Sequence, residues 1–305
     1  LTRSVGSSKQ RKWEMAAVSV CLVGYGFKPI MVVTPLLAWV YDPCFLSGGF
    51  ATAWKVRGRL HLGLWLTPLV LPVLLAGSAV EWRTSAGFEF EGVSTLEYAS
   101  TQPEIILHYL RLVIWPSPLV LDYGWPVERS WMVIGITSAV VLGLVGATIW
   151  ALIRKPIWGF AGAWFFINLA PTSSFVPIAD LAFEHRMYLA LLAPLAVMVL
   201  CVRSLLDGKP LLEKLVPILA PVALVACAGL TYLRNGDYRS ESRLWAKNVA
   251  ARPEHPRPRN NLGRQLALHR QFDAAVTEWK KAIALRPDYG IAWHNLGHAQ
   301  RDRGD

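Results

Sequence analysis

The tripeptide Glu184-His185-Arg186, with Tyr188 two residues further on, lies between two apolar stretches. Charged side chains held against hydrocarbon are costly and often mark functional positions. Because a guanidinium is always charged and contacts phosphate oxygens in a bidentate manner, Arg186 and the neighbouring His185 could bind a phosphate or pyrophosphate head group. Glu184 could orient Arg186 or act as a base. In the alternative interpretation, these residues form an ion pair at the start of the next apolar stretch, with Arg186 and Tyr188 as interfacial anchors.

Two more positions in the apolar part of the sequence carry candidate groups. Lys28 separates two apolar runs, a position that favours a functional role for its ammonium group, although it could instead snorkel or pair internally. Arg111, Asp122 and Tyr188 are secondary candidates. Asp122 precedes the stretch from Tyr123 to Pro126 and could serve only to cap a turn, since Asp, Gly and Pro all favour turns.

Several chemistries have no support in the sequence. It contains no P-loop, GxGxxG, GxSxG or HExxH pattern, which argues against nucleotide-dependent, serine-hydrolase and zincin activities. The four cysteines show neither a CxxC pair nor a metal-ligand spacing, and the seven histidines are scattered. We therefore expect no metal site, no disulfide framework and no evident cofactor.

The elements that must position these residues lie in two regions of different composition. The chain of 305 residues is 53% hydrophobic, yet its last quarter is polar and rich in arginine. Its formal net charge is +10, but the basic residues form short clusters between apolar runs, a pattern typical of membrane topology rather than of nucleic-acid binding. The sequence predicts an all-α protein, with a polytopic helical membrane domain over residues 1–233 and an α-solenoid over residues 234–305.

The apolar runs predict the membrane spans, since crossing a bilayer takes about 20 apolar residues. Four candidates are clear: Leu62 to Val80, Val133 to Ile153, Met187 to Val202 and Leu215 to Leu233. Ile157 to Ala170 is a shorter fifth candidate. Residues 15–41 form two half-length runs broken at Lys28-Pro29, which could be one kinked span or a re-entrant pair. Residues 105–121 contain Arg111 and stop being apolar at Pro116, so an interfacial or re-entrant helix is expected there.

With these spans, the loops alternate in charge. Three basic clusters fall on one side, which the positive-inside rule makes cytoplasmic. The clusters are Lys55 with Arg57 and Arg59, Arg154 with Lys155, and Arg203 with Lys209 and Lys214. The loop that carries Glu184 and the whole polar tail then share the outer face of the membrane.

The polar tail repeats itself at an offset of 34 residues. Trp245 aligns with Trp279, and Asn261-Leu262-Gly263 aligns with Asn295-Leu296-Gly297. A period of 34 with small residues where two helices cross is typical of the tetratricopeptide repeat. One complete repeat is predicted at residues 256–289, with partial units on either side, because each hairpin needs a neighbour to bury its face.

Two amides in the repeats are candidates for binding a partner. Asn261 and Asn295 lie on the first helix of each hairpin, the helix expected to line the concave side of such an array, and could hydrogen-bond an extended peptide backbone. The alternative is a role in helix packing or simple exposure to solvent.

Three stretches resemble a known family. They are Gly26-Phe27-Lys28 with residues 32–35 and Tyr41-Asp42, the stretch from Leu110 to Tyr123, and residues 171–188, and all precede the repeats. Together they resemble the bacterial relatives of the TMTC-type protein O-mannosyltransferases of the GT-C superfamily. The resemblance implies transfer of a mannose-like sugar from a polyprenyl-phosphate donor in the membrane lipid to an acceptor polypeptide held by the repeats, with Arg186 and Lys28 near the donor phosphate. It also implies a bacterial inner-membrane protein with periplasmic repeats.

The resemblance also implies an incomplete enzyme. GT-C enzymes carry their catalytic acidic residue in the first external loop, which would precede Leu1, and neither Asp122 nor Glu184 matches that motif. We therefore nominate no catalytic residue and expect this fragment to be inactive alone. The rival hypothesis is a membrane-anchored tetratricopeptide scaffold without catalysis.

Overall fold

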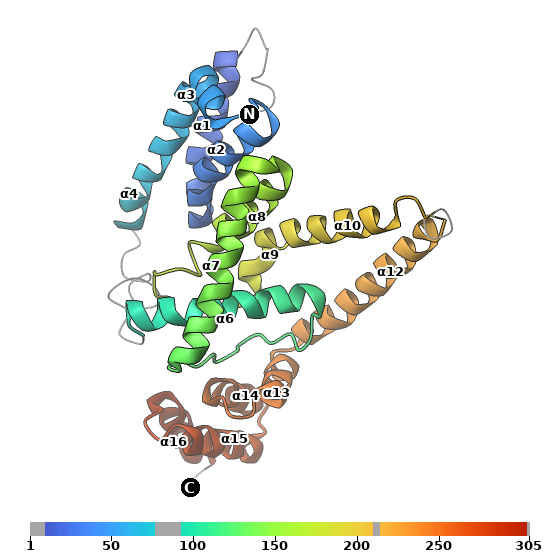
Figure 1. Cartoon of the computed structure of the whole chain (residues 1–305). Coiled ribbons are helices and arrows are strands. Elements are labelled where there is room, and N and C mark those ends of the chain that lie inside the picture. The colour runs from blue at the N-terminus through green and yellow to red at the C-terminus, as the bar shows by residue number, and fades with distance from the viewer. Residues whose placement is uncertain (1–9, 77–92, 210–213, 304–305) are drawn as a thin grey trace. The chain divides into compact units, whose positions relative to one another are not determined.

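The computed structural model describes residues 10–76, 93–209 and 214–303, and within these ranges the chain is helical and contains no β-strand (Figure 1). The all-α fold class predicted from the sequence is thereby confirmed. The chain forms two compact units, the first made of residues 1–116, 126–181 and 185–201, and the second of residues 117–125, 182–184 and 202–305. Two short segments of the apolar half thus belong to the unit that carries the repeats.

The first unit contains most of the apolar helices. They are α1 (Gln10–Tyr25), α2 (Thr34–Phe45), α3 (Phe50–Leu66), α4 (Leu71–Ala76), α6 (Thr95–Ile114), α7 (Trp131–Arg154), α8 (Pro156–Leu169) and α9 (Met187–Ala190), with the 3₁₀ turns η2 (Pro29–Val33), η3 (Thr67–Val70) and η4 (Glu184–Arg186). The boundary between the units falls within α10 (Leu192–Leu206).

The hairpin of α7 and α8 shows how a small residue sets the packing in this unit. The two helices meet at Lys155, and Pro156 opens α8 where its missing N–H is not needed. Gly159 lies against the backbone of Ala151 and Leu152, where a Cβ atom would collide. Glycine at position 159 therefore permits the close approach of the two helices.

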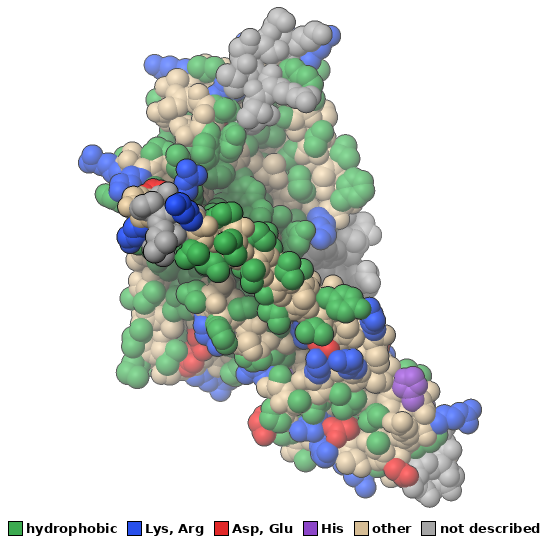
Figure 2. Space-filling view, turned by 90° about the vertical axis from the view of Figure 1, so that its right-hand side faces the viewer, with side chains coloured by type: hydrophobic (Ala, Val, Ile, Leu, Met, Phe, Trp, Pro, Cys, Tyr) green, Lys and Arg blue, Asp and Glu red, His purple; other side chains and the backbone are tan. Residues whose placement is uncertain are grey.

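Two helices among the described residues are long and apolar enough to cross a membrane. They are Trp131–Arg154, with a mean hydropathy of 2.2, and Val216–Arg239, with 2.0. Met187 to Val202 falls in a helix pair that passes the same test together but is bent by 56°, and Pro156–Leu169 is a shorter apolar helix. Apolar side chains cover much of the surface displayed in Figure 2, and many of those on α7 are exposed.

The predicted span from Leu62 to Val80 is corrected by the structure. The helix in this region begins earlier, at Phe50, and ends at Leu66, where η3 and the short α4 follow. Pro68 and Pro72 interrupt the run because proline lacks the N–H group that a continuous helix requires. Residues 77–80 lie outside the described residues.

The predicted break at Lys28-Pro29 lies where the sequence placed it, and the region from residue 105 forms a helix that is not a candidate span. The chain leaves the helical path between Tyr25 and Pro29, where Lys28 has extended backbone angles. Residues 105–114 continue α6, which begins with a capping box between Ser94 and Glu97 and is not among the apolar candidates for a span. Whether either region re-enters a membrane stays a prediction.

The second unit ends in the repeat helices. It contains α12 (Val216–Asn235), the turn η5 (Gly236–Arg239), α13 (Glu241–Ala251), α14 (Pro256–Leu268), α15 (Phe272–Leu285) and α16 (Gly290–Arg303). α14 and α15 cross where Ala275 is fully buried and where a Cβ on Gly263 would lie 2.7 Å from Nε1 of Trp279. The small residues of the 34-residue pattern therefore occupy the helix crossing, as predicted.

Candidate functional site

The repeat helices of the second unit hold a non-helical stretch of polypeptide, residues 117–125, of the same unit. The buried side chain of Asn248, on α13, donates from Nδ2 to the carbonyl oxygen of Asp122 at 3.0 Å. Its Oδ1 accepts from the backbone N–H of Asp122, also at 3.0 Å. An amide that pairs with both backbone groups of one residue recognises the main chain and not the side chain.

The carboxylate of Asp122 is held by two cationic side chains at the start of α14. Arg257 donates to Oδ1 from Nη2 at 2.6 Å and to Oδ2 from Nε, and Nε2 of His255 lies 3.1 Å from Oδ1. Burial alone would raise the pKa of this carboxyl, but contact with His255 and Arg257 holds that pKa well below its ordinary value. The positive end of a helix dipole favours an anion at the same place.

A second carboxylate, that of Glu184, completes the attachment of this stretch. Its Oε1 accepts a hydrogen bond from the hydroxyl of Tyr123 at 2.9 Å and one from the backbone N–H of Val120. Burial, followed by the nearby charge of Glu184, raises the pKa of the Tyr123 hydroxyl, so that this group is a donor at neutral pH. Glu184 therefore contacts residues 120 and 123. Among the described residues it forms no hydrogen bond or ion pair with Arg186, which it was expected to orient.

Aromatic and cationic groups close the other side of the stretch. The guanidinium of Arg252 lies 5.4 Å from the ring centre of Tyr123 and 5.9 Å from that of Trp125. Such cation–π contacts contribute roughly 0.5–1 kcal/mol at exposed sites. Backbone pairing, an ion pair and ring contacts thus act together on nine residues of chain, from 117 to 125.

Arg186 lies in the first unit, where it binds main-chain oxygens. Its Nη1 donates to the carbonyl oxygens of Leu181 at 2.7 Å and Thr172 at 3.0 Å, and its Nη2 donates to that of Asp180. The buried Tyr98 hydroxyl also donates to the Thr172 oxygen at 2.6 Å. The guanidinium, 8% exposed, therefore fixes the path of the loop over residues 171–183.

The other predicted phosphate-binding residues lie in the first unit with their side chains exposed. Lys28 is close enough to His185 for their charges to interact, and Arg186 and Asp180 act on the same imidazole. Tyr188 is 80% exposed, and Arg111 is exposed in the last turn of α6. The charge of Lys28 thus acts on the imidazole of His185, while the role of both residues in binding a phosphate stays a prediction.

The two repeat amides join one hydrogen-bonded group with Asn260. Asn295 donates to Oδ1 of Asn260 at 2.9 Å, and Asn260 donates to Oδ1 of Asn261 at 3.3 Å. The backbone carbonyl of Asn260 also accepts from Trp279, at 3.1 Å. These contacts fit the packing alternative for Asn261 and Asn295, both of which stay partly exposed. Their binding of a peptide is not tested.

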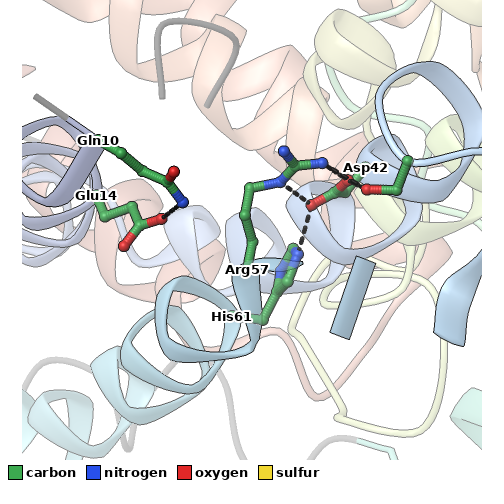
Figure 3. Close-up of polar contacts among 6 residues, drawn as sticks. Gln10, Glu14, Asp42, Arg57 and His61 are labelled. Atoms are coloured by element: carbon green, nitrogen blue, oxygen red, sulfur yellow. Dashed lines mark hydrogen bonds and ion pairs between the residues drawn. The ribbon is translucent and has the colours of Figure 1, made fainter. Parts of the chain in front are cut away.

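The sequence analysis missed a buried polar group in the first unit (Figure 3). Asp42, on α2, accepts from Nε of Arg57 at 2.7 Å and lies 2.8 Å from Nε2 of His61, both on α3. Ser47 donates to the same carboxylate at 2.5 Å. Arg57 was expected in a cytoplasmic loop, but it is buried within α3, at a residue with non-helical backbone angles. The signal available in the sequence was the spacing of Arg57 and His61, which places two polar groups on one helix face.

No metal centre emerges from the described ranges, in which no three His, Cys, Asp or Glu side chains gather closely enough to hold an ion. The polar groups are instead paired with one another and with the backbone, as at Asp42 and Asp122. The chemistry that these arrangements support is recognition of polypeptide and of anions.

The comparisons with known proteins identify the tail. Residues 263–304 match the family model described as the TPR repeat. No curated protein and no solved structure matches the chain. The chain therefore contains a tetratricopeptide repeat, a class of helical hairpin that stacks into binding surfaces for proteins. The relationship to the TMTC-type mannosyltransferases has no support from any of these comparisons.

Proposed function

We propose that this chain is a membrane-anchored protein whose repeats bind a polypeptide partner. The observation that carries the proposal is the pairing of Asn248 with both backbone groups of Asp122. It means that the helices of this unit can hold a non-helical polypeptide through its main chain. The TPR match supports the same function, because such repeats generally serve protein–protein interaction.

The anchoring half of the proposal rests on α7 and α12. Only 6% of the most apolar stretch of Trp131–Arg154 is buried inside the protein, and none of that of Val216–Arg239. An apolar helix of 24 residues whose side chains are so little buried finds a suitable environment in lipid. We propose the bacterial inner membrane with the repeats in the periplasm, as the resemblance to the TMTC-type family implies. The basic pair Arg154-Lys155, at the junction of α7 and α8, would then face the cytoplasm.

A crosslinking experiment in intact cells tests the binding function. A photoreactive side chain replaces Arg264 on α14 or His298 on α16, both exposed on the first helices of their hairpins, and Lys280 on α15 is the matched control. We expect a distinct set of polypeptides to be captured from positions 264 and 298 and not from 280. Equal capture from all three positions would reject a specific binding face.

Topology is tested by cysteine labelling from either side of the membrane. Tyr188→Cys and Arg270→Cys report on the loop region and the repeats, because both positions are exposed. The proposal expects a membrane-impermeant maleimide to reach both from the same compartment. Labelling from opposite compartments would reject the periplasmic arrangement, and extraction of the chain by alkaline carbonate would reject anchoring itself.

A finer function is proposed for the parent protein: sugar transfer from a polyprenyl-phosphate donor to the bound polypeptide. What favours it is that the charge of Lys28 acts on the imidazole of His185, although the two exposed side chains come from distant parts of the sequence. Arg186 would hold the loop that presents His185, and Lys28 would stabilise charge on the departing phosphate. The proposal assigns no residue of this chain as the base that activates the acceptor hydroxyl.

Transfer of labelled sugar by the full-length parent tests the finer function. Lys28→Ala removes one donor to the phosphate, so we expect a fall of about tenfold or more. Lys155→Ala, an exposed lysine between α7 and α8, is the control. Unchanged transfer by Lys28→Ala would remove this residue from the mechanism. Absence of transfer by the parent itself would leave the scaffold function alone.

A further inference from the structure

A groove runs between α1 and α3 in the first unit. It consists of two hollows, of about 730 and 360 Å³, whose linings share Arg11, Glu14 and Arg59. Both volumes fall in the range of small-molecule sites, roughly 300–1,000 Å³. Because the same three side chains line both, the two hollows are one continuous groove.

The two ends of this groove differ in chemistry. The larger hollow is lined by polar and cationic groups, among them Lys55, and also by the apolar side chains of Val56 and Leu62. The smaller one is lined also by Met15, Val18 and Leu60, which are apolar. Arg11 and Arg59 stand at the junction. A groove that combines cationic and apolar side chains, with a further cation, Lys55, at one end, matches a molecule with an anionic head and a hydrocarbon chain.

The charge of the groove is positive. Arg11, Lys55 and Arg59 are exposed, whereas Glu14, the acidic residue in the lining, accepts a hydrogen bond from Gln10 at 2.7 Å. Figure 3 shows Gln10 and Glu14 on α1 across from Arg57 on α3. The guanidinium of Arg57 is neutralised by Asp42, so the three exposed cations exceed the one carboxylate of the lining.

The groove also lies where a lipid head group would be. Arg11 lies in the first turn of α1, before the apolar residues that begin at Met15, and Arg59 lies within α3, just before its apolar last turns. Trp54, at the cationic end, is 52% exposed, and indole rings favour the boundary between head groups and acyl chains. Basic pockets between helices on the cytoplasmic side of membrane proteins bind anionic head groups.

We infer that this groove binds an anionic membrane phospholipid, with its phosphate between Arg11 and Arg59 and the start of an acyl chain along Met15 and Leu60. The apolar hollow favours a lipid over free phosphate, because an inorganic ion would leave that end empty. The ion pair of Asp42 with Arg57 keeps the floor of the groove fixed, so little rearrangement accompanies binding. The inference rests on the membrane anchoring proposed above, but not on peptide binding or sugar transfer.

The test uses the full chain, purified in an uncharged detergent and titrated with short-chain phosphatidylglycerol. Short-chain phosphatidylcholine and inorganic phosphate serve as the other ligands. We expect phosphatidylglycerol to bind at least about tenfold more tightly than either. Arg11→Gln should weaken its binding by about tenfold, because one charge-assisted contact is lost, and Arg59→Gln by a similar factor. The control pair is Arg154→Gln and Lys155→Gln, which lie outside the groove and should leave the affinity unchanged.

Three results would overturn the inference. Inorganic phosphate that displaces phosphatidylglycerol at equal concentration would mean a site for free anions. Equal losses in the groove variants and the control pair would mean general surface attraction. Undiminished binding by Arg11→Gln, whose side chain is exposed and not needed for packing, would remove the arginine contact. None of these results bears on anchoring, which the carbonate extraction tests separately.

Discussion

The two units hold one aspartate each in the same constellation, Asp42 in the first and Asp122 in the second. Each carboxylate accepts from Nε and Nη2 of one arginine and lies close to Nε2 of one histidine. The surroundings differ. The side chain of Arg57 is 3% exposed and that of His61 is fully buried, whereas Arg257 is 38% exposed.

The difference in burial predicts two different roles. At Asp42 the side chains of Arg57 and His61 are both removed from water, so the loss of the carboxylate leaves an uncompensated charge inside the protein. At Asp122 the arginine can turn to solvent when its partner is lost. The partners of Asp42 lie 15 and 19 residues away in the sequence, but those of Asp122 lie more than 130 residues away. The first group therefore fixes two neighbouring helices, and the second ties a distant stretch of chain to the repeats.

The largest effect is expected from Asp42→Ala. The buried guanidinium of Arg57 loses its counterion, and breaking a buried pair in this way costs about 3–5 kcal/mol. The free energy of unfolding, measured from helicity during denaturation in detergent, should fall by that amount. Asp207→Ala, at an exposed aspartate directly after α10, is the control. A loss below about 1 kcal/mol would contradict the importance of burial here.

A smaller and more local effect is expected from Asp122→Asn. The lost contacts with a charged, partly exposed arginine are worth about 2 kcal/mol, and they act on residues 117–125. Hydrogen exchange should accelerate in that stretch and not in α15. A double-mutant cycle with Arg257→Gln should give a smaller coupling energy than the cycle of Asp42→Asn with Arg57→Gln. Equal coupling in the two cycles would remove the distinction between the sites.

The next prediction separates backbone recognition from charge at Asp122. Asn248→Ala leaves the ion pair intact but leaves the backbone N–H and carbonyl of Asp122 without their amide partner, which costs about 1–2 kcal/mol. Exchange in residues 117–125 should accelerate less than in Asp122→Asn. Asn295→Ala, which removes an amide that bonds to Asn260 instead, should leave that stretch unchanged. Identical exchange in Asn248→Ala and the unmodified chain would contradict the backbone contact.

The smallest effect is the pH dependence of the same stretch. Because the pKa of Asp122 is depressed in the folded chain, its contribution is complete above the ordinary value of about 3.9 and is lost as the pH falls from there through the folded pKa. Pepsin should therefore cleave within residues 117–125 increasingly as the pH is lowered below about 4. Asp122→Asn should be cleaved without this dependence. The same acid profile in both chains would exclude Asp122 as its cause.

The repeats could be predicted from the sequence because their contacts are short in range. Gly263, Ala275 and Trp279 lie within one 34-residue hairpin, and the packing of two adjacent helices restricts their size directly. One departure from this 34-residue pattern could also be recognised in the sequence. At the 34-residue offset Asn248 replaces the fully buried Ala282, and a polar residue at a packing position indicates a partner.

The polar groups of the apolar half were less accessible to sequence analysis. Asp42 and Arg57 come from two helices, and the charge of Arg57 looked like that of a loop because Lys55 and Arg59 flank it. The partner of Asp122 is set by tertiary structure alone, since nothing local relates position 122 to position 257. The span from Leu62 was overextended because hydropathy averages over Pro68 and Pro72, which interrupt a helix regardless of their neighbours.

The loop over residues 171–183 is tied by Arg186 to carbonyl oxygens, which every amino acid carries. The side chains of the loop can therefore change during evolution while its course is preserved. Position 186 has no such freedom. A lysine there would present one compact charge where a flat, forked cation is required to reach three oxygens at once.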